Sequence, residues 1–155
     1  MVRVDVRREI VAAARRWVGT PFAHQARAPG VGLDCIGLVV CAARAAGLDV
    51  DDCRTYKRRP NPRQLLGHLS AQAVRSSRRD DPLAVESDVD AASCADVGDV
   101  LAFWFLRPSL PRHLGIVTER GLLHTSLELG RVVEHPLDRE WRGRAHSAWT
   151  VRGVE

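Results

Sequence analysis

One stretch of the chain, residues 19 to 47 (GTPFAHQARAPGVGLDCIGLVVCAARAAG), restricts the fold most strongly, because a loop rich in glycine and proline is followed directly by an apolar helical pattern. Asp34 is a favourable N-cap, since its carboxylate can accept an amide N–H of the first turn. Apolar residues then recur at helical spacing, and Gly47 stands where a left-handed C′ residue belongs. The stretch therefore predicts a loop, a helix that starts at Cys35, and a stop at Gly47.

Cys35 falls in the first turn of this predicted helix. The helix dipole and the unpaired amides there favour an anion, so we expect the thiolate to be stabilised. Gly37 has no side chain, which leaves room for a neighbouring backbone to approach the same turn. Position alone leaves two interpretations open, a nucleophilic cysteine or a buried structural thiol.

The length of 155 residues and the hydrophobic content of 45% are those of one domain with a sizeable core, so we predict a single domain over residues 1–155. The first ten residues enter an amphipathic pattern directly, and no apolar run reaches membrane-spanning length. We therefore expect neither a Sec-type signal nor a membrane span.

The cysteines and the charge balance exclude several classes of function. The four cysteines (35, 41, 53 and 94) form no CxxC pair and lack the spacing of zinc ligands, so we expect no metal. A net charge of +4 would favour approach to an anionic polymer such as a cell wall or a nucleic acid. However, arginines alternate with acidic residues throughout, aromatic residues make up only 5%, and no nucleic-acid-binding motif is present. An arginine-rich composition without a nucleic-acid partner is the better interpretation.

Two further helices are predicted in the first half of the chain. Asp5 can cap a helix whose apolar face includes Ile10 and Trp17 and whose arginines fall on the other face. Asn61 and Pro62 have the N-cap and N1 pattern of a second helix. The polar segment 48–60, between the Cys35 helix and the Asn61 helix, is expected to be a solvated loop, anchored by Tyr56. Residues 70–96 carry little pattern beyond a short strand indicated at 84–89.

Strand patterns dominate the second half. The expected strands are 100–105 (VLAFWF), 113–118 (HLGIVT), 122–127 (LLHTSL), 131–137 (RVVEHPL) and 147–151. Short turns join them, as in an antiparallel meander, and the first is apolar enough to be covered on both faces. Helices followed by strands indicate an α+β domain.

Two histidines fall on neighbouring strands of this meander, His113 and His124. If residues 118–119 form the turn, the two lie directly opposite each other on one face; if residues 120–121 form it, they are staggered by about 13 Å. Such a pair can supply a general base and the group that orients it. Two strand histidines that bond water at a sheet edge are the alternative. No such partner is expected for the later histidines, His135 and His146.

Three segments in order resemble the NlpC-like family of cell-wall cysteine peptidases, which have a small papain-like fold. They are DCIGL (34–38), GDVLAF (98–103), and HLGIV with LLHTS (113–126). The resemblance covers nearly the whole chain outside about 70–96. The longer segment 19–39, with Trp141 and the C-terminal tail, is most similar to the branch encoded in phage tail and gene-transfer-agent gene clusters.

The resemblance implies that Cys35 is the nucleophile, His113 the base and later acid, and His124 the group that orients His113. It implies hydrolysis of an amide bond in peptidoglycan stem peptides, often one that involves a D-amino acid, through a thioester on Cys35 and without a cofactor. The backbone N–H of Cys35, at a helix start, is a natural oxyanion donor, and Gln25 is the suggested second donor.

The chain departs from the family pattern at two positions. Phe22 stands where many relatives have a tyrosine whose hydroxyl borders the cleft, and Ile36 replaces a common serine. Phe22, Gln25 and Asp34 are the residues that we expect on the substrate side of the site.

The leading hypothesis is a tail-associated murein peptidase that opens the wall locally during DNA entry. Its expected partners are the stem peptide and other tail proteins. It would be made in the cytoplasm without a signal peptide and carried to the periplasm or cell wall by the particle. The alternatives are a structural tail-tip protein with little activity and a related thiol enzyme, such as an amidase or lipid acyltransferase. The complete set of Cys35, His113 and His124 favours an enzyme.

Overall fold

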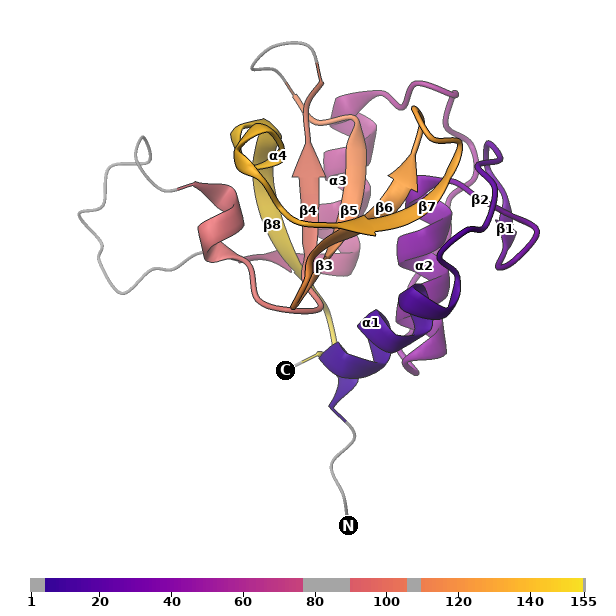
Figure 1. Cartoon of the computed structure of the whole chain (residues 1–155), viewed down its shortest axis with the longest axis horizontal. Coiled ribbons are helices and arrows are strands. Elements are labelled where there is room, and N and C mark those ends of the chain that lie inside the picture. The colour runs from indigo at the N-terminus through magenta and orange to yellow at the C-terminus, as the bar shows by residue number, and fades with distance from the viewer. Residues whose placement is uncertain (1–4, 77–89, 106–109, 155) are drawn as a thin grey trace.

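A six-stranded antiparallel sheet forms the centre of the molecule, and helices pack on it (Figure 1). The strand order is β3-β8-β4-β5-β6-β7. The computed structural model describes residues 5–76, 90–105 and 110–154. The predicted α+β class is confirmed.

The helices begin where local chemistry predicts. Those of the first half are α1 (Val6–Arg16), α2 (Cys35–Ala45) and α3 (Pro62–Gln72). Asp5, Asp34 and Asn61 are their N-caps, and each accepts backbone N–H groups of the first turn through its side chain. Gly47 follows α2 with a φ of 84°, the left-handed conformation expected of a C′ glycine.

The strands of the sheet are β3 (Ala73–Arg75), β4 (Val100–Phe103), β5 (His113–Thr118), β6 (Gly121–Ser126), β7 (Arg131–His135) and β8 (Ala145–Val151). Strands β4 to β7 follow one another as the predicted meander. The last strand does not extend it: β8 returns to pair with β4, and β3 pairs with the outer side of β8. A short helix, α4 (Arg139–Arg144), which the sequence pattern did not indicate, lies between β7 and β8.

Three smaller features differ from the expectations. Strands β1 (Arg27–Ala28) and β2 (Gly32–Leu33) form a short hairpin within the glycine-rich loop, and a 3₁₀ helix, η1 (Ala91–Cys94), precedes β4. Strand β4 ends at Phe103 rather than at residue 105. The expected strand at 84–89 lies outside the described residues.

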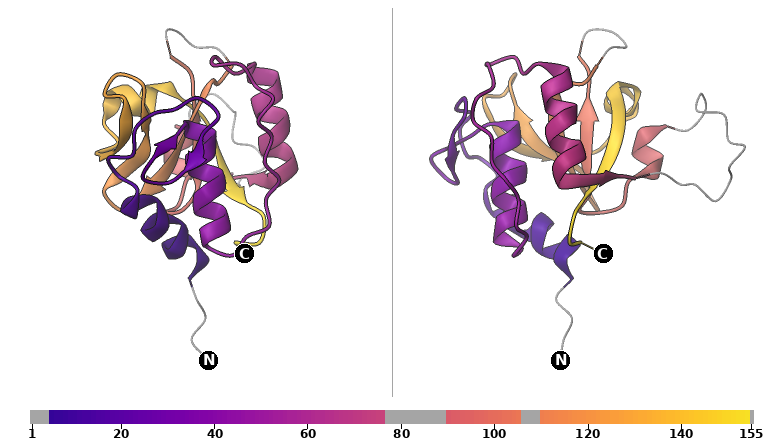
Figure 2. Two further views of the ribbon diagram at one scale, coloured as in Figure 1. Left: turned by 90° about the vertical axis from the view of Figure 1, so that its right-hand side faces the viewer. Right: turned by 180° about the vertical axis from the view of Figure 1, so that it is seen from behind.

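The core occupies both faces of the sheet. On one face, α1, α2 and α3 cover the strands, and the view from behind in Figure 2 shows α2 and α3 in front of them. Along β4, Val100 and Ala102 belong to this helix-covered core, whereas Leu101 and Phe103 belong to a separate cluster on the other face. All four are buried, as predicted for a strand covered on both sides.

Ion pairs join α1 to the sheet. Arg7 Nη1 lies 2.7 Å from Oδ1 of the buried Asp99, and Arg15 Nη2 lies 2.7 Å from Oε2 of Glu134 on β7. Gly98 permits the first contact, since a Cβ there would lie 2.9 Å from the Cα of Arg7. No helix in the described ranges has the length and apolar character needed to cross a membrane.

Candidate active site

Asp34 shapes the first turn of α2. Its Oδ1 accepts the N–H of Gly37 at 2.7 Å, and its Oδ2 accepts the N–H of Gln25 in the preceding loop at 2.7 Å. A Cβ at Gly37 would collide with the backbone carbonyl of Ala26. The expected close approach of a neighbouring backbone is confirmed, and it holds the loop against the turn that carries Cys35.

A buried polar cluster packs against the first turn of α2. Arg27 Nη1 donates to Asp34 Oδ1 at 3.1 Å, and Arg27 Nε donates to Asp52 Oδ2 at 2.9 Å. The Tyr56 hydroxyl donates to Asp34 Oδ2 and accepts from Arg27 Nη2 at 2.8 Å. The three charged side chains are 5% to 8% exposed, so their charges are paired rather than solvated. Tyr56 thus anchors the 48–60 loop, as predicted.

The hairpin between β5 and β6 has neither of the two registers considered from sequence. Ile116 pairs with Leu123 and Thr118 with Gly121, so residues 119–120 form the turn. In this register His113 and His124 are diagonal neighbours on one face, within reach of long side chains. His113 Nε2 lies 2.8 Å from His124 Nδ1, so the sheet brings the two predicted histidines into direct contact.

A third imidazole extends this pair, which corrects the expectation that His135 has no partner. His124 Nε2 lies 2.8 Å from His135 Nε2, and His135 Nδ1 lies 2.8 Å from the carbonyl oxygen of Pro136. The Trp141 ring packs on all three imidazoles, with its centroid 4.6 Å from that of His124. The sequence pattern did not indicate this contact because His135 lies on β7, two strands away from His113, and touches only the intervening His124, although a histidine on the next strand of a meander is a usable signal.

One cleft of about 820 Å³ contains Cys35, His113 and His124, together with Phe22 and Asp34 from the expected substrate side. The Cys35 sulfur accepts a backbone hydrogen bond from Leu114, the residue that follows His113. The start of α2 and the start of β5 therefore meet at the cleft. This arrangement suits nucleophilic attack by sulfur with an imidazole as base.

The cleft walls are mainly cationic. Its charged lining residues besides Asp34 are Arg58, Arg59, Arg112, Arg144 and Glu128. The guanidinium of Arg58 lies 5.9 Å from the centroid of the Phe22 ring, which gives this aromatic position a cation–π contact. Such a cleft favours a substrate that carries carboxylates.

Burial sets the protonation of Cys35 and His113. Burial, with a smaller contribution from the Asp34 carboxylate, raises the pKa of the Cys35 thiol to about 12, although backbone hydrogen bonds oppose the shift. Burial lowers the pKa of His113 to about 4, and burial with the neighbouring His113 and His135 lowers the pKa of His124. The expectation of a thiolate stabilised by the helix start is therefore wrong: desolvation outweighs the amides, and both the thiol of Cys35 and the imidazole of His113 are neutral at rest.

Gln25 is directed away from the proposed oxyanion position. Its side-chain Nε2 donates to the carbonyl of Tyr56 at 2.7 Å, and Gln25 does not line the cleft. Its φ of 58° places the backbone in the left-handed region, which lets its N–H point at Asp34. In this conformation Gln25 positions the loop.

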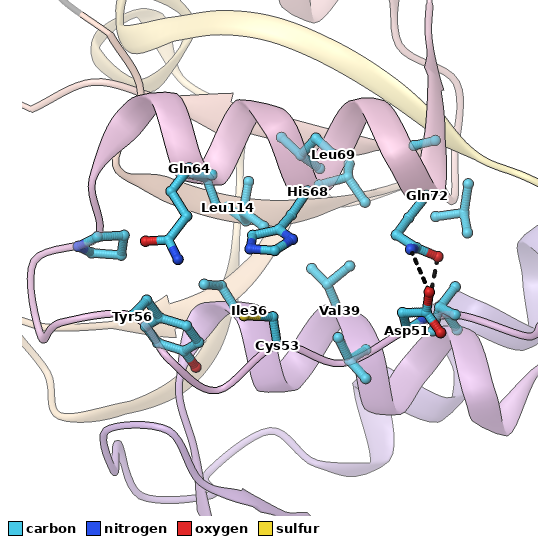
Figure 3. A pocket seen from close by; sticks show the side chains of 18 residues that line it. Ile36, Val39, Asp51, Cys53, Tyr56, Gln64, His68, Leu69, Gln72 and Leu114 are labelled. Atoms are coloured by element: carbon cyan, nitrogen blue, oxygen red, sulfur yellow. Dashed lines mark hydrogen bonds between the residues drawn. The ribbon is translucent and has the colours of Figure 1, made fainter.

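A second cavity, of about 80 Å³, lies between α2 and α3 (Figure 3). Its lining is largely apolar, with Ile36, Val39 and Leu69 turned into it, and Tyr56 lines both this cavity and the cleft that contains Cys35. An apolar cavity of about 150 Å³ holds a molecule the size of benzene, so this one has no room for an acyl chain.

The three imidazoles do not converge on a point. In the part of the chain that the structure describes, no group of three or more His, Cys, Asp or Glu side chains is arranged to hold a metal ion. The histidines bond one another in a row instead.

Comparison with known proteins supports the fold. No family model and no curated protein matches the sequence. Among solved structures, the chain is similar to an NlpC/P60 family protein from Bacillus cereus (TM-score 0.64, 14% identity, 94% of this chain and 40% of that one). It is also similar to the NlpC/p60 domain of the peptidoglycan hydrolase SagA (0.57, 21% identity, 94% and 98%). A third similar structure is RipD from Mycobacterium tuberculosis, a non-catalytic NlpC/p60 domain protein adapted to peptidoglycan binding (0.52, 14% identity, 97% and 99%).

The fold is therefore that of NlpC/P60 domains, and its cleft holds a cysteine and a histidine pair. This chain spans only 40% of the Bacillus cereus protein but 98% of the SagA domain. The similarity of RipD shows that this fold also occurs without catalysis, so activity depends on the residues in the cleft rather than on the fold.

Proposed function

We propose that this protein is a cysteine peptidase that hydrolyses an amide bond in peptidoglycan stem peptides. The observation that carries the proposal is the presence of Cys35 in one cleft with a hydrogen-bonded His113–His124 pair. The cationic cleft walls favour the carboxylates that stem peptides carry. The NlpC/P60 fold adds support, because the similar SagA domain is from a peptidoglycan hydrolase.

The mechanism follows from the protonation of the pair. Neutral His113 takes the thiol proton as the Cys35 sulfur attacks the amide carbon, which gives a tetrahedral intermediate whose oxyanion lies near the start of α2. His113 returns the proton to the departing amine, and a thioester forms. Water, deprotonated by His113, then releases the carboxylate and restores the thiol. His124 keeps the His113 ring in place throughout.

The finer biological setting is also a proposal. We propose that the protein acts in the periplasm or cell wall as part of a phage tail or tail-like particle. The support is the resemblance of residues 19–39 and Trp141 to the branch found in such gene clusters. Copurification of a tagged chain with tail-like particles, expressed from its own genome, would support this setting, and absence from purified particles would argue against it.

Mass spectrometry of digested murein tests the reaction. We expect the wild-type protein to release new stem-peptide amino and carboxyl termini, and the Cys35→Ala variant to release none. Cys53→Ala is the matched control, since Cys53 lines the neighbouring cavity rather than the cleft and should leave the products unchanged.

Other outcomes separate the alternatives. Cleavage only between the glycan and the peptide would identify an amidase, and activity on acyl lipids without murein products would identify a lipid acyltransferase. Binding to murein without Cys35-dependent products would indicate a structural or binding role, as in RipD.

A further inference from the structure

We propose that His135 is a positioning residue that fixes the tautomers of His124 and His113, so that the nitrogen of His113 left for Cys35 has no proton. This inference rests on the proposed function and names a residue that the resemblance does not assign. It follows from the direction of the hydrogen bonds along the row of imidazoles.

The direction is set at the outer end of the row. The Pro136 carbonyl can only accept a hydrogen bond, so the Nδ1 atom of His135, 2.8 Å away, must carry a proton. In a neutral imidazole the other nitrogen is then an acceptor. With His135 neutral, its Nε2 atom has no proton and accepts from His124.

The same donor–acceptor argument applies to the next two rings of the row. His124 donates from Nε2 to His135, so its Nδ1 is the acceptor that faces His113 at 2.8 Å. His113 must then donate from Nε2. Its remaining nitrogen, Nδ1, has no proton and is the only one free to take the proton of Cys35.

Without His135 the direction is no longer set. The His113–His124 hydrogen bond closes equally well with the donor and acceptor exchanged, and the exchanged form puts the proton on Nδ1 of His113, which cannot then act as a base. Burial makes the choice matter, because the low pKa values of both rings keep them neutral and each has only one proton to place. Trp141 packs on the three rings and restrains their rotation.

Two variants separate the positioning role from simple packing. His135→Phe keeps a ring against Trp141 but offers no acceptor to His124. His135→Gln can place a carbonyl oxygen near the position of the original Nε2 atom and restore the acceptor. His68 is exposed and lines the cavity between α2 and α3 rather than the cleft that holds Cys35, so His68→Phe is the matched control for loss of an imidazole.

The first readout is nitrogen NMR of protein labelled in its histidines, which distinguishes protonated from bare ring nitrogens. We expect a bare Nδ1 on His113 in the wild type, the His135→Gln and the His68→Phe proteins, and protonation shared between the two nitrogens in His135→Phe. A proton on Nδ1 of His113 in the wild type, or unchanged tautomers in His135→Phe, would overturn the inference.

The second readout is kinetic. We expect His135→Phe to lower kcat on murein about tenfold with little change in KM, and His135→Gln to recover most of it, since a lost hydrogen bond of this kind acts on the base rather than on substrate binding. The site-specific alkylation rate of Cys35 should fall in parallel. A proportional rise in KM, or an equal loss in both variants, would point to a packing role and overturn it.

The spectrum and the alkylation rate need no substrate. If the wild-type protein forms no murein product while the NMR tautomers follow the expectation, the proposed function fails and the positioning role of His135 stands. If products form and the tautomers differ from the expectation, the proposed function stands and the positioning role of His135 fails.

Discussion

At Cys35, two local effects oppose each other. The amides at the start of α2 favour a thiolate, whereas burial and the adjacent Asp34 carboxylate raise the pKa of the thiol to about 12. Cys53 is in the opposite situation, since it is solvent-accessible and the hydroxyl of Thr55 lowers the pKa of its thiol. We therefore expect reactivity at Cys35 to depend on proton removal by His113 rather than on a standing thiolate.

This difference predicts an order of alkylation. Near neutral pH we expect iodoacetamide to label Cys53 before Cys35, because Cys53 has the larger thiolate fraction and the greater access to solvent. We expect His113→Gln to slow labelling of Cys35 severalfold and to leave Cys53, the internal control, unchanged. Site-resolved mass spectrometry measures both rates. Fast labelling of Cys35 that is independent of His113 would show a standing thiolate instead.

At the scale of elements, the loop 19–34 can pack closely against the start of helix α2 because Gly37 has no side chain. Gly37 brings the helix start against the Ala26 carbonyl, and Asp34 bonds both segments. Strand β5 has a similar close contact, since a Cβ at Gly115 would lie 3.3 Å from the Cβ of His124. Both glycines lie beside the site, where a small shift moves a reacting group.

Gly37→Ala should therefore destabilise the protein. We expect a loss of about 1–3 kcal/mol in the free energy of unfolding, typical of overpacking against backbone that cannot rotate away. The activity should fall more than the stability explains, since Cys35 moves with the turn. Urea unfolding and murein digestion measure the two effects.

Gly67→Ala is the control for this substitution. Gly67 lies within α3, and a Cβ added there would have nothing within 4 Å, so alanine should be neutral or stabilising by up to about 1 kcal/mol. Equal effects at both glycines would contradict the close contact proposed for Gly37.

For the whole molecule, pH acts on stability through groups that are buried on folding. His113 and His124 are neutral in the folded state, with lowered pKa values, whereas unfolded histidines bind protons near pH 6.5. Below pH 6.5 the unfolded state therefore binds more protons than the folded state, and the free energy of unfolding decreases as the pH is lowered. Glu134 and Asp52 act in a lower window: hydrogen bonds from Arg15 and Arg27 lower their pKa values, so their contribution is lost only as pH falls below about 4.

We expect the free energy of unfolding to fall by about 2 kcal/mol from His113 alone between pH 7 and pH 5. Urea unfolding at the two pH values measures the change. His113→Gln, which cannot titrate, should lose that part of the pH dependence. A wild-type stability that is flat across this range would show that the imidazoles are not buried in neutral form.

The sequence by itself determined the features that depend on neighbours along the chain. The N-caps Asp5, Asp34 and Asn61, the stop at Gly47 and the alternation that puts His113 and His124 on one face of the sheet are short-range effects, so they could be predicted. The resemblance in three ordered segments predicted the fold and the presence of Cys35, His113 and His124 in one cleft, but not the position of Gln25 outside it.

The tertiary structure alone decided the features that depend on distant parts of the chain. The return of β8 to β4, the diagonal register of His113 and His124, and the contact of His135 with His124 all arise from pairing between strands. The raised pKa of Cys35 is of the same kind, because burial by the whole fold outweighs the amides of its own helix. Local sequence records which groups are present, and packing decides which of them meet and how much water they retain.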